Sequence, residues 1–173
     1  IVSEGDWGRI SLIMNYFTIF LVFAGSFFPR SITTYTAQNN TNISSNNSAL
    51  IIGNRIILIA SVITIICGVV FIKTINPIQN LASKSILLLL LLMVSVPILS
   101  QNIICFFQGL GKIGIMTVLE LIRSIITSAL IILGVRSMYD PAMGWALGKV
   151  SGILLVLFIL IITYYVFQRK SLF

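Results

Sequence analysis

Residues 116–130 read MTVLELIRSIITSAL, and two charged side chains, Glu120 and Arg123, stand near the middle of this otherwise apolar stretch. The stretch lies in a longer apolar segment, residues 113–135, which as an α-helix can cross the hydrocarbon core of a bilayer, because about 20 residues suffice. An ionised residue at the centre of such a helix costs about 2.5–3.5 kcal/mol. The two charges therefore predict a membrane helix with one face turned away from lipid.

The whole chain has the composition of an integral membrane protein. Of its 173 residues 58% are apolar, only 9% are charged and none is His, whereas soluble domains are about 25% charged. Four further apolar runs are long enough to cross a bilayer, namely residues 10–28, 51–72, 85–107 and 145–167. We therefore expect an all-α, polytopic membrane helix bundle with five transmembrane helices in a single domain, residues 1–173. No soluble domain fits between the spans.

The connections between the spans are short and polar. Residues 29–50, rich in Asn and Ser, are expected to form a flexible polar loop that begins with a short helical continuation through Ile32 and Tyr35. The chain opens on Ile1 rather than Met and has an odd number of spans, so we expect it to be part of a longer protein. Cys67 and Cys105 fall inside spans, where a free cysteine behaves as a small apolar residue.

The eleven basic residues, against four acidic ones, are scattered one or two per loop. Membrane orientation explains this distribution better than binding to nucleic acid does, so no nucleic-acid partner is expected. The loops and ends fall into two sets. One set holds Arg30, Arg55, Lys112, Arg169 and Lys170, and the other holds Arg9, Lys73, Lys84 and Arg136. The slight excess in the first set favours an outer N-terminus and a cytoplasmic C-terminus.

The span at 113–135 has a single polar stripe, with Glu120 and Arg123 three residues apart and able to pair. The other polar residues recur at spacings of three, four or seven: Thr117, Ser124, Thr127 and Ser128. Aliphatic residues cover the rest of the helix: Leu119, Leu121, Ile122, Ile125, Ile126 and Ile132. We expect the stripe to face the bundle interior or a wet cavity. The alternative is a Glu–Arg pair that only locks helix packing.

Lys149 is a further basic residue at membrane depth, in the run PAMGWALGKVSG. It either faces the same cavity or snorkels to the surface, since Trp145, four residues earlier, is typical of membrane interfaces. Gly144, Gly148 and Gly152 in the same run have the spacing of a helix-packing seam, which in a transporter could also bend or slide.

Two other polar groups lie within spans. Pro97 predicts a kink beside Ser100, Gln101 and Asn102, which either line a pathway or hydrogen-bond between helices. Ser11, Asn15 and Thr18 form a shorter stripe in the first span, whose default interpretation is interhelical hydrogen bonding.

The residues that the chain lacks exclude several classes of protein. It has no His, no cysteine cluster with metal-ligand spacing, no paired carboxylates and no Gly-rich phosphate loop. Hydrolysis, metal catalysis and work driven by ATP lack their residues, so we expect no enzymatic activity, no metal and no cofactor. Passive or ion-coupled translocation remains.

Two stretches resemble a known family of transporters. EGDWGRISLIMNYFTIFLVFAGSFFPRSITTYTAQ, residues 4–38, resembles the start of polysaccharide and O-antigen flippases, where a short acidic turn with Gly precedes the second span. QNIICFFQGLGKIGIMTVLELIRSIITSALIILGV, residues 101–135, resembles the junction of their fourth and fifth spans. These flippases belong to the multidrug, oligosaccharidyl-lipid and polysaccharide exporter superfamily.

The resemblance implies a partial chain, spans two to six of a two-lobe, alternating-access transporter in a prokaryotic plasma membrane. The first helix and the second lobe of the same chain would be missing, and membrane lipids would surround the protein. The implied substrate is a lipid-linked oligosaccharide, whose pyrophosphate would be drawn to cations.

On that resemblance, Arg123 and Lys149 would be cavity cations, Arg30 a head-group contact at the inner mouth and Glu120 the partner that tunes Arg123. The wider substrate-binding set adds Gln101, Asn102 and Asn15. Pro97 and the glycine seam would be mechanical.

Three other functions compete with this interpretation. A drug/cation antiporter of the same superfamily needs acids to bind cations, and the spans contain one acid, Glu120. A non-transporting scaffold subunit would use its polar residues only to join helices. A membrane-embedded glycosyltransferase or lipid phosphatase is opposed by the lack of His and of paired acids.

Overall fold

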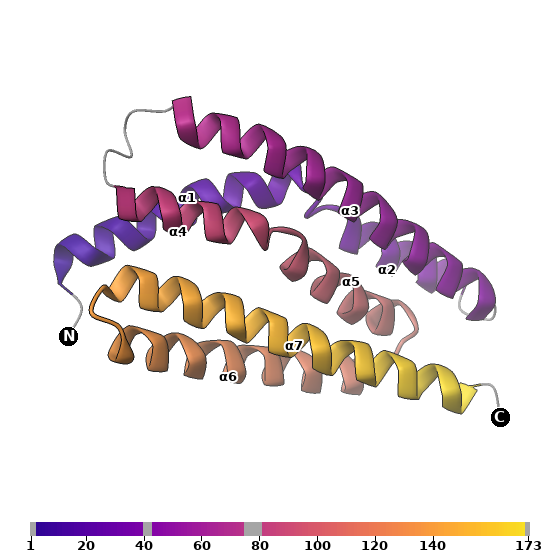
Figure 1. The fold of residues 1–173 in the computed structure, drawn as a ribbon. Helices are drawn as coiled ribbons and strands as arrows, with labels where there is room; N and C mark the ends of the chain where they lie inside the picture. The colour runs from indigo at the N-terminus through magenta and orange to yellow at the C-terminus, as the bar shows by residue number, and fades with distance from the viewer. Residues whose placement is uncertain (1–2, 40–42, 75–80, 172–173) are drawn as a thin grey trace.

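The computed structural model describes residues 3–39, 43–74 and 81–171, and within these ranges the regular structure is entirely helical. The helices are α1 (Glu4–Phe23), α2 (Phe28–Gln38), α3 (Ile43–Thr74), α4 (Leu81–Leu92), α5 (Ser95–Gly109), α6 (Ile113–Ser137) and α7 (Pro141–Ser171). They run roughly along one axis, and the two termini of the chain lie at opposite ends of the bundle (Figure 1). The expectation of an all-α membrane bundle is confirmed.

Four segments are long and apolar enough to cross a membrane: Ser45–Thr74, Ser83–Gly109, Ile113–Ser137 and Pro141–Arg169. The pair α1 and α2, bent by 44°, makes a fifth candidate if it is counted as one span. The expected spans at 51–72, 113–135 and 145–167 therefore lie inside α3, α6 and α7. The other two, at 10–28 and 85–107, are broken helices.

The break between α1 and α2 follows from Gly25 and Pro29. Gly25 has φ of 102°, a left-handed conformation that favours glycine. Its N–H donates to the Val22 carbonyl and the Ser26 N–H donates to the Leu21 carbonyl, which is the Schellman pattern that ends a helix. Pro29 then occupies the first turn of α2, where its missing N–H costs nothing.

The kink predicted at Pro97 is present, as a break between α4 and α5. Proline has no N–H for the Met93 carbonyl four residues earlier, and its ring crowds that carbonyl. The chain instead uses tighter three-residue bonds, from the Met93 N–H to the Leu90 carbonyl and from the Val94 N–H to the Leu91 carbonyl. The span therefore changes direction before Pro97 rather than at it.

The expectation of a polar loop over residues 29–50 needs correction, because 29–38 and 43–50 are helical, while its middle part, 40–42, lies outside the described residues. The short helical continuation through Ile32 and Tyr35 is present as α2, and Ile43 already belongs to α3. α2 buries Pro29, Ile32 and Thr36 on one face. This periodic face outweighs the polar composition of α2, since it packs on α5 and α3.

The core consists of two apolar clusters along the bundle axis. The first joins α1 and α4 to α3, the start of α5 and the start of α7, and it contains Phe17, Leu87 and Ile98. The second joins α2 and the end of α5 to α6 and α7, and it contains Ile32, Phe107 and Val156. Buried polar residues lie between the clusters: on α5, Ser100 and Asn102 fall between Ile98 and Ile103.

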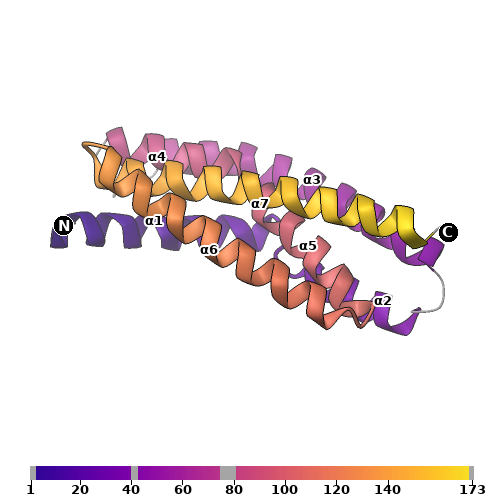
Figure 2. The ribbon, with the colours of Figure 1, turned by 90° about the horizontal axis from the view of Figure 1, so that it is seen from below.

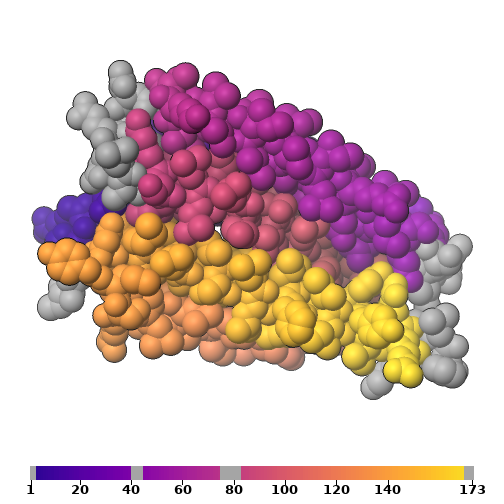
Figure 3. Space-filling model, in the orientation of Figure 1, coloured from indigo at the N-terminus to yellow at the C-terminus, as the bar shows by residue number. Residues whose placement is uncertain are grey.

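α6 and α7 pack backbone to backbone through a seam of glycines. A Cβ placed on Gly148 would lie 2.3 Å from the Leu130 carbonyl oxygen, and one on Gly144 would lie 2.2 Å from the Gly134 carbonyl oxygen. At Gly152 it would lie 2.9 Å from Thr127 Cα. These contacts support the packing interpretation of Gly144, Gly148 and Gly152, and Gly134 is a member that sequence reasoning missed. In the space-filling view α7 also lies along α4 and α5 (Figure 3).

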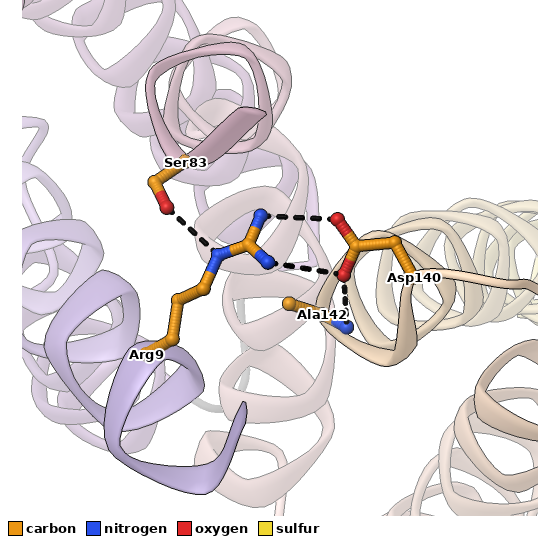
Figure 4. A network of polar contacts seen from close by, with 4 residues as sticks. All are labelled: Arg9, Ser83, Asp140 and Ala142. Atoms are coloured by element: carbon orange, nitrogen blue, oxygen red, sulfur yellow. Dashed lines mark hydrogen bonds and ion pairs between the residues drawn. The ribbon is translucent and has the colours of Figure 1, made fainter. Parts of the chain in front are cut away.

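A polar network joins three helices at the end of the bundle nearer the N-terminus (Figure 4). The Arg9 guanidinium on α1 makes a bidentate contact with Asp140, at 3.2 Å and 3.0 Å, and its Nε donates to Ser83 Oγ of α4 at 2.8 Å. Asp140 Oδ1 also accepts from the Ala142 N–H, so the same carboxylate caps α7. Sequence reasoning did not pair Arg9 with Asp140, which lies 131 residues away.

The glycine seam predicts that Gly148→Ala is destabilising, because even a methyl group would push α6 and α7 apart. Overpacking of this kind costs about 1–3 kcal/mol. Chemical unfolding of the purified protein in detergent measures the loss. Gly114→Ala is the matched control, since a Cβ there meets nothing within 4 Å, and equal effects of the two changes would contradict the seam.

The polar network predicts that Arg9→Gln and Asp140→Ala each lower the free energy of unfolding by about 1 kcal/mol, since the side chains of this ion pair are 22% and 31% exposed. Asp140→Asn should lose less than Asp140→Ala because asparagine still caps α7. The same unfolding assay checks the order. Arg136→Gln, which removes an exposed arginine at this end of the bundle, should change little.

Candidate functional site

An open groove of about 780 Å³ lies between α5, α6 and α7, at the level where the two apolar clusters meet. Every member of the predicted stripe on α6 lines it: Thr117, Glu120, Arg123, Ser124, Thr127 and Ser128. α5 contributes Pro97, Ser100 and Gln101, and α7 contributes Ile153 and Val156. The stripe therefore faces a cavity, as the sequence predicts.

The opposite side of α6 has the exposure expected of a helix in lipid. Ile125 and Ile132 are more than half exposed, whereas Leu121, which is also exposed, lines the groove. Ile122 and Ile126 are half-buried, whereas Leu119 is buried in the second apolar cluster and does not face lipid. The helix thus has an aliphatic outer face and a polar inner face.

Glu120 and Arg123 form an ion pair across one helical turn. The distance from Arg123 Nη2 to Glu120 Oε2 is 2.7 Å, and each side chain is about one third exposed, 34% and 33%. The pair therefore lies in the open groove rather than in the closed core. Partial exposure and pairing together lower the cost of holding these charges inside a span.

Gln101 on α5 contacts both members of this pair. Its Oε1 accepts a short hydrogen bond from Arg123 Nη1, and its Nε2 donates to Glu120 Oε1 at 3.4 Å. An amide carries both a donor and an acceptor, so one neutral side chain satisfies a cation and an anion together. Gln101, Glu120 and Arg123 thus form one cluster that joins α5 to α6.

Lys149 is not part of the groove lining. Its Nζ lies 4.8 Å from the centre of the Trp145 ring and 5.3 Å from that of the Phe17 ring on α1, in cation–π geometry. Gly148 lies against Leu130 and Gly152 against Thr127, a register that places Lys149 about 10 Å from Arg123 along the axis. The Lys149 ammonium group points back along α7 toward Trp145 and so toward the nearer end of the helix, as expected of a snorkelling lysine. The residue as a whole is half-buried.

Three other predicted residues lie apart from the groove. Asn102 is fully buried, and its Nδ2 donates to Asn54 Oδ1 on α3 at 2.9 Å. Of the two roles expected for Asn102, the structure therefore shows hydrogen bonding between helices. Asn15 is exposed on α1, as are Ser11 and Thr18, so this stripe makes no buried interhelical contact. Arg30 is exposed in the first turn of α2.

Sequence reasoning missed Asn54, the partner of Asn102. The available signal was its position, because a lone asparagine in the apolar run 51–72 needs a polar partner. No sequence spacing relates it to Asn102, 48 residues away. Among the described residues there is no cluster of His, Cys, Asp or Glu that could hold a metal ion.

Comparison with known proteins gives one finding. The model of the family described as "Polysaccharide biosynthesis protein" matches residues 1–173, the whole chain. The comparisons with curated proteins and with solved structures gave no match. The family match agrees with the resemblance seen in residues 4–38 and 101–135, and with a multi-pass membrane fold. The chain therefore belongs to the polysaccharide biosynthesis protein family, within the superfamily of multidrug, oligosaccharidyl-lipid and polysaccharide exporters.

Proposed function

We propose that this chain is a lobe of a flippase that moves a lipid-linked oligosaccharide across the plasma membrane by alternating access, together with a second lobe of the same protein. The observation that carries the proposal is the polar groove inside the bundle, with Arg123, Glu120 and Gln101 on its wall. A groove of this polarity beside an aliphatic outer face suits a substrate with a polar head and a lipid tail.

The chemistry of the groove favours a pyrophosphate over a cation. Arg123 offers a planar guanidinium that binds phosphate oxygens in a bidentate manner. Glu120 occupies one edge of it, so an incoming pyrophosphate would exchange with this carboxylate. Gln101 can stay bonded to either side chain during the exchange, because its amide presents a donor and an acceptor.

Lys149 and Arg30 would extend the positive electrostatic potential of Arg123 along the bundle. Lys149, about 10 Å from Arg123 by helical rise, would attract the pyrophosphate on the way to one opening. Arg30, exposed on α2, would contact a head group at the inner mouth. Asn15, exposed on α1 with Ser11 and Thr18, would offer hydrogen bonds to sugar hydroxyls. Pro97 and the glycine seam would act mechanically, and Asn102 would support the site from behind through Asn54.

A drug/cation antiporter fits less well. Glu120 is the sole acid lining the groove described here, and it is already paired with Arg123. The chain as a whole carries a formal charge of +7, which repels cations and attracts anions. Family membership also points to polysaccharide precursors. A non-transporting scaffold would show neither transport that depends on Arg123 nor water access along the polar stripe of α6.

The proposal predicts that Arg123→Gln in the native full-length protein lowers transport of lipid-linked oligosaccharide at least tenfold, because the bidentate cation is lost. Arg123→Lys should retain part of the rate, since it keeps the charge without the planar fork. Transport into proteoliposomes measures both. Arg136→Gln, on the last turn of the same helix, is the matched control. Normal insertion with wild-type transport in Arg123→Gln would remove the role of Arg123.

The groove also predicts a pattern of water access along α6. Single cysteines at Thr117, Ser124 and Ser128 should react with a membrane-impermeant maleimide, because these residues line the groove. Cysteines at Val118, Ile125 and Ile132 should be protected by lipid, because these residues are exposed and lie outside the groove lining. The background replaces Cys67 and Cys105 with Ala. Protection of both sets would show that the stripe joins helices and holds no water, as the scaffold alternative requires.

A further inference from the structure

We propose that three hydroxyl groups on α6, those of Ser124, Thr127 and Ser128, bind the first sugar of the substrate beside the pyrophosphate at Arg123. All three residues line the groove between α5, α6 and α7. The inference rests on the proposed function and deepens it, because it assigns a sugar subsite and the direction in which the head group lies along α6.

The three hydroxyls are set apart by having no hydrogen bond. A Ser or Thr within a helix commonly donates to the carbonyl four residues earlier, as Thr117 on the same helix does to Ile113. Across the described part of the chain, Ser124, Thr127 and Ser128 make no hydrogen bond, and Thr127 Oγ1 is buried as well. A hydroxyl without a partner inside a membrane protein costs free energy, so these groups favour a polar ligand in the groove.

The unbonded hydroxyls lie on one side of the ion pair. Ser124 directly follows Arg123, and Ser128 lies about 7.5 Å beyond Arg123 along the helix axis. On the other side of Glu120, the lining hydroxyl of α6 is that of Thr117, which is already bonded. The first sugar is bonded directly to the pyrophosphate, so a head group anchored at Arg123 extends toward Ser128. This direction leads to the end of the bundle that holds the N-terminus (Figure 1).

The walls that face these hydroxyls are apolar. The contact of Gly152 with Thr127 places Ile153 of α7 at their level, and on α5 Pro97 lies about one turn from Gln101 in the same direction. A sugar ring carries hydroxyls at its edge and C–H groups on its faces, so one polar wall between two apolar walls suits it. Protein hydroxyls both donate and accept, as sugar hydroxyls do, whereas a phosphate at this level would lack a cation.

Binding of two lipids to the native full-length protein in detergent tests the proposal. One is the lipid-linked oligosaccharide purified from the cells that make the protein, and the other is polyprenyl pyrophosphate of the same chain length, which carries no sugar. We expect the wild type to bind the first lipid more tightly. Ser124→Ala/Ser128→Ala should weaken binding of the oligosaccharide lipid about tenfold and leave polyprenyl pyrophosphate within about twofold, because two hydrogen bonds to the sugar are lost. Alanine preserves the helix.

Ser137→Ala/Ser151→Ala is the matched control, since it removes two exposed hydroxyls that are bonded within their own helices and lie outside the groove lining. It should leave both affinities unchanged, and a loss equal to that of Ser124→Ala/Ser128→Ala would overturn the subsite. Equal weakening of the two lipids by Ser124→Ala/Ser128→Ala would also overturn it, because the hydroxyls would then contact the pyrophosphate.

Arg123→Gln separates this inference from the proposed function. It should weaken both lipids, because both carry the pyrophosphate. If it does so while Ser124→Ala/Ser128→Ala binds the oligosaccharide lipid as the wild type does, the sugar subsite is wrong and the proposed function stands. Unchanged binding of both lipids in Arg123→Gln would remove the anchor at Arg123 and the subsite with it.

Discussion

The backbone contact between α6 and α7 is the constraint on which the groove depends. Because four glycines remove side chains from the contact, α7 lies against the backbone of α6 rather than against its side chains. This close approach fixes the register of the two helices, so that Ile153 and Val156 stand opposite the polar stripe. The stripe is then walled on one side by α7 and on the other by α5. Larger residues in the seam would widen the bundle and leave the charges facing lipid.

The groove lies where the apolar packing of the bundle is interrupted. Ile98 belongs to one core cluster and Ile103 to the other, and the residues between them on α5 include Ser100, Gln101 and Asn102. Each of these makes a hydrogen bond within the protein, while Asn102 Oδ1 and Thr127 Oγ1 are buried without a partner among the described residues. Apolar packing lies on both sides of this level. Electrostatic contacts within a polar layer enclosed by apolar packing are stronger than the same contacts in water.

Much of this arrangement could be predicted from local patterns. The length of the apolar runs predicts the spans. The spacing of polar residues around Glu120 predicts which face of α6 lines the groove. Both patterns depend only on residues that are close in sequence. The pairing of residues that are far apart in the sequence could not be predicted from local patterns. Nothing in the sequence relates Arg9 to Asp140, or Gln101 to Arg123, since each pair forms only when packing brings separate helices together. The helical residues of 29–50 were missed because their composition resembles a loop while their buried face is set by α5.

Two spans of the bundle are broken and three are continuous, and in Figure 2 the continuous α6 and α7 cross the level at which α1 gives way to α2. α1 packs with α4, and α2 packs with α5, so each half of the bundle has its own pair of short helices. A bilayer that thins or thickens on one side is met by tilting of helices. Here the break leaves α1 and α2 at 44° to each other, while α3, α6 and α7 run unbroken through both halves. A tilt of one short helix therefore need not be shared by the whole span, because the break interrupts the helix between the two halves.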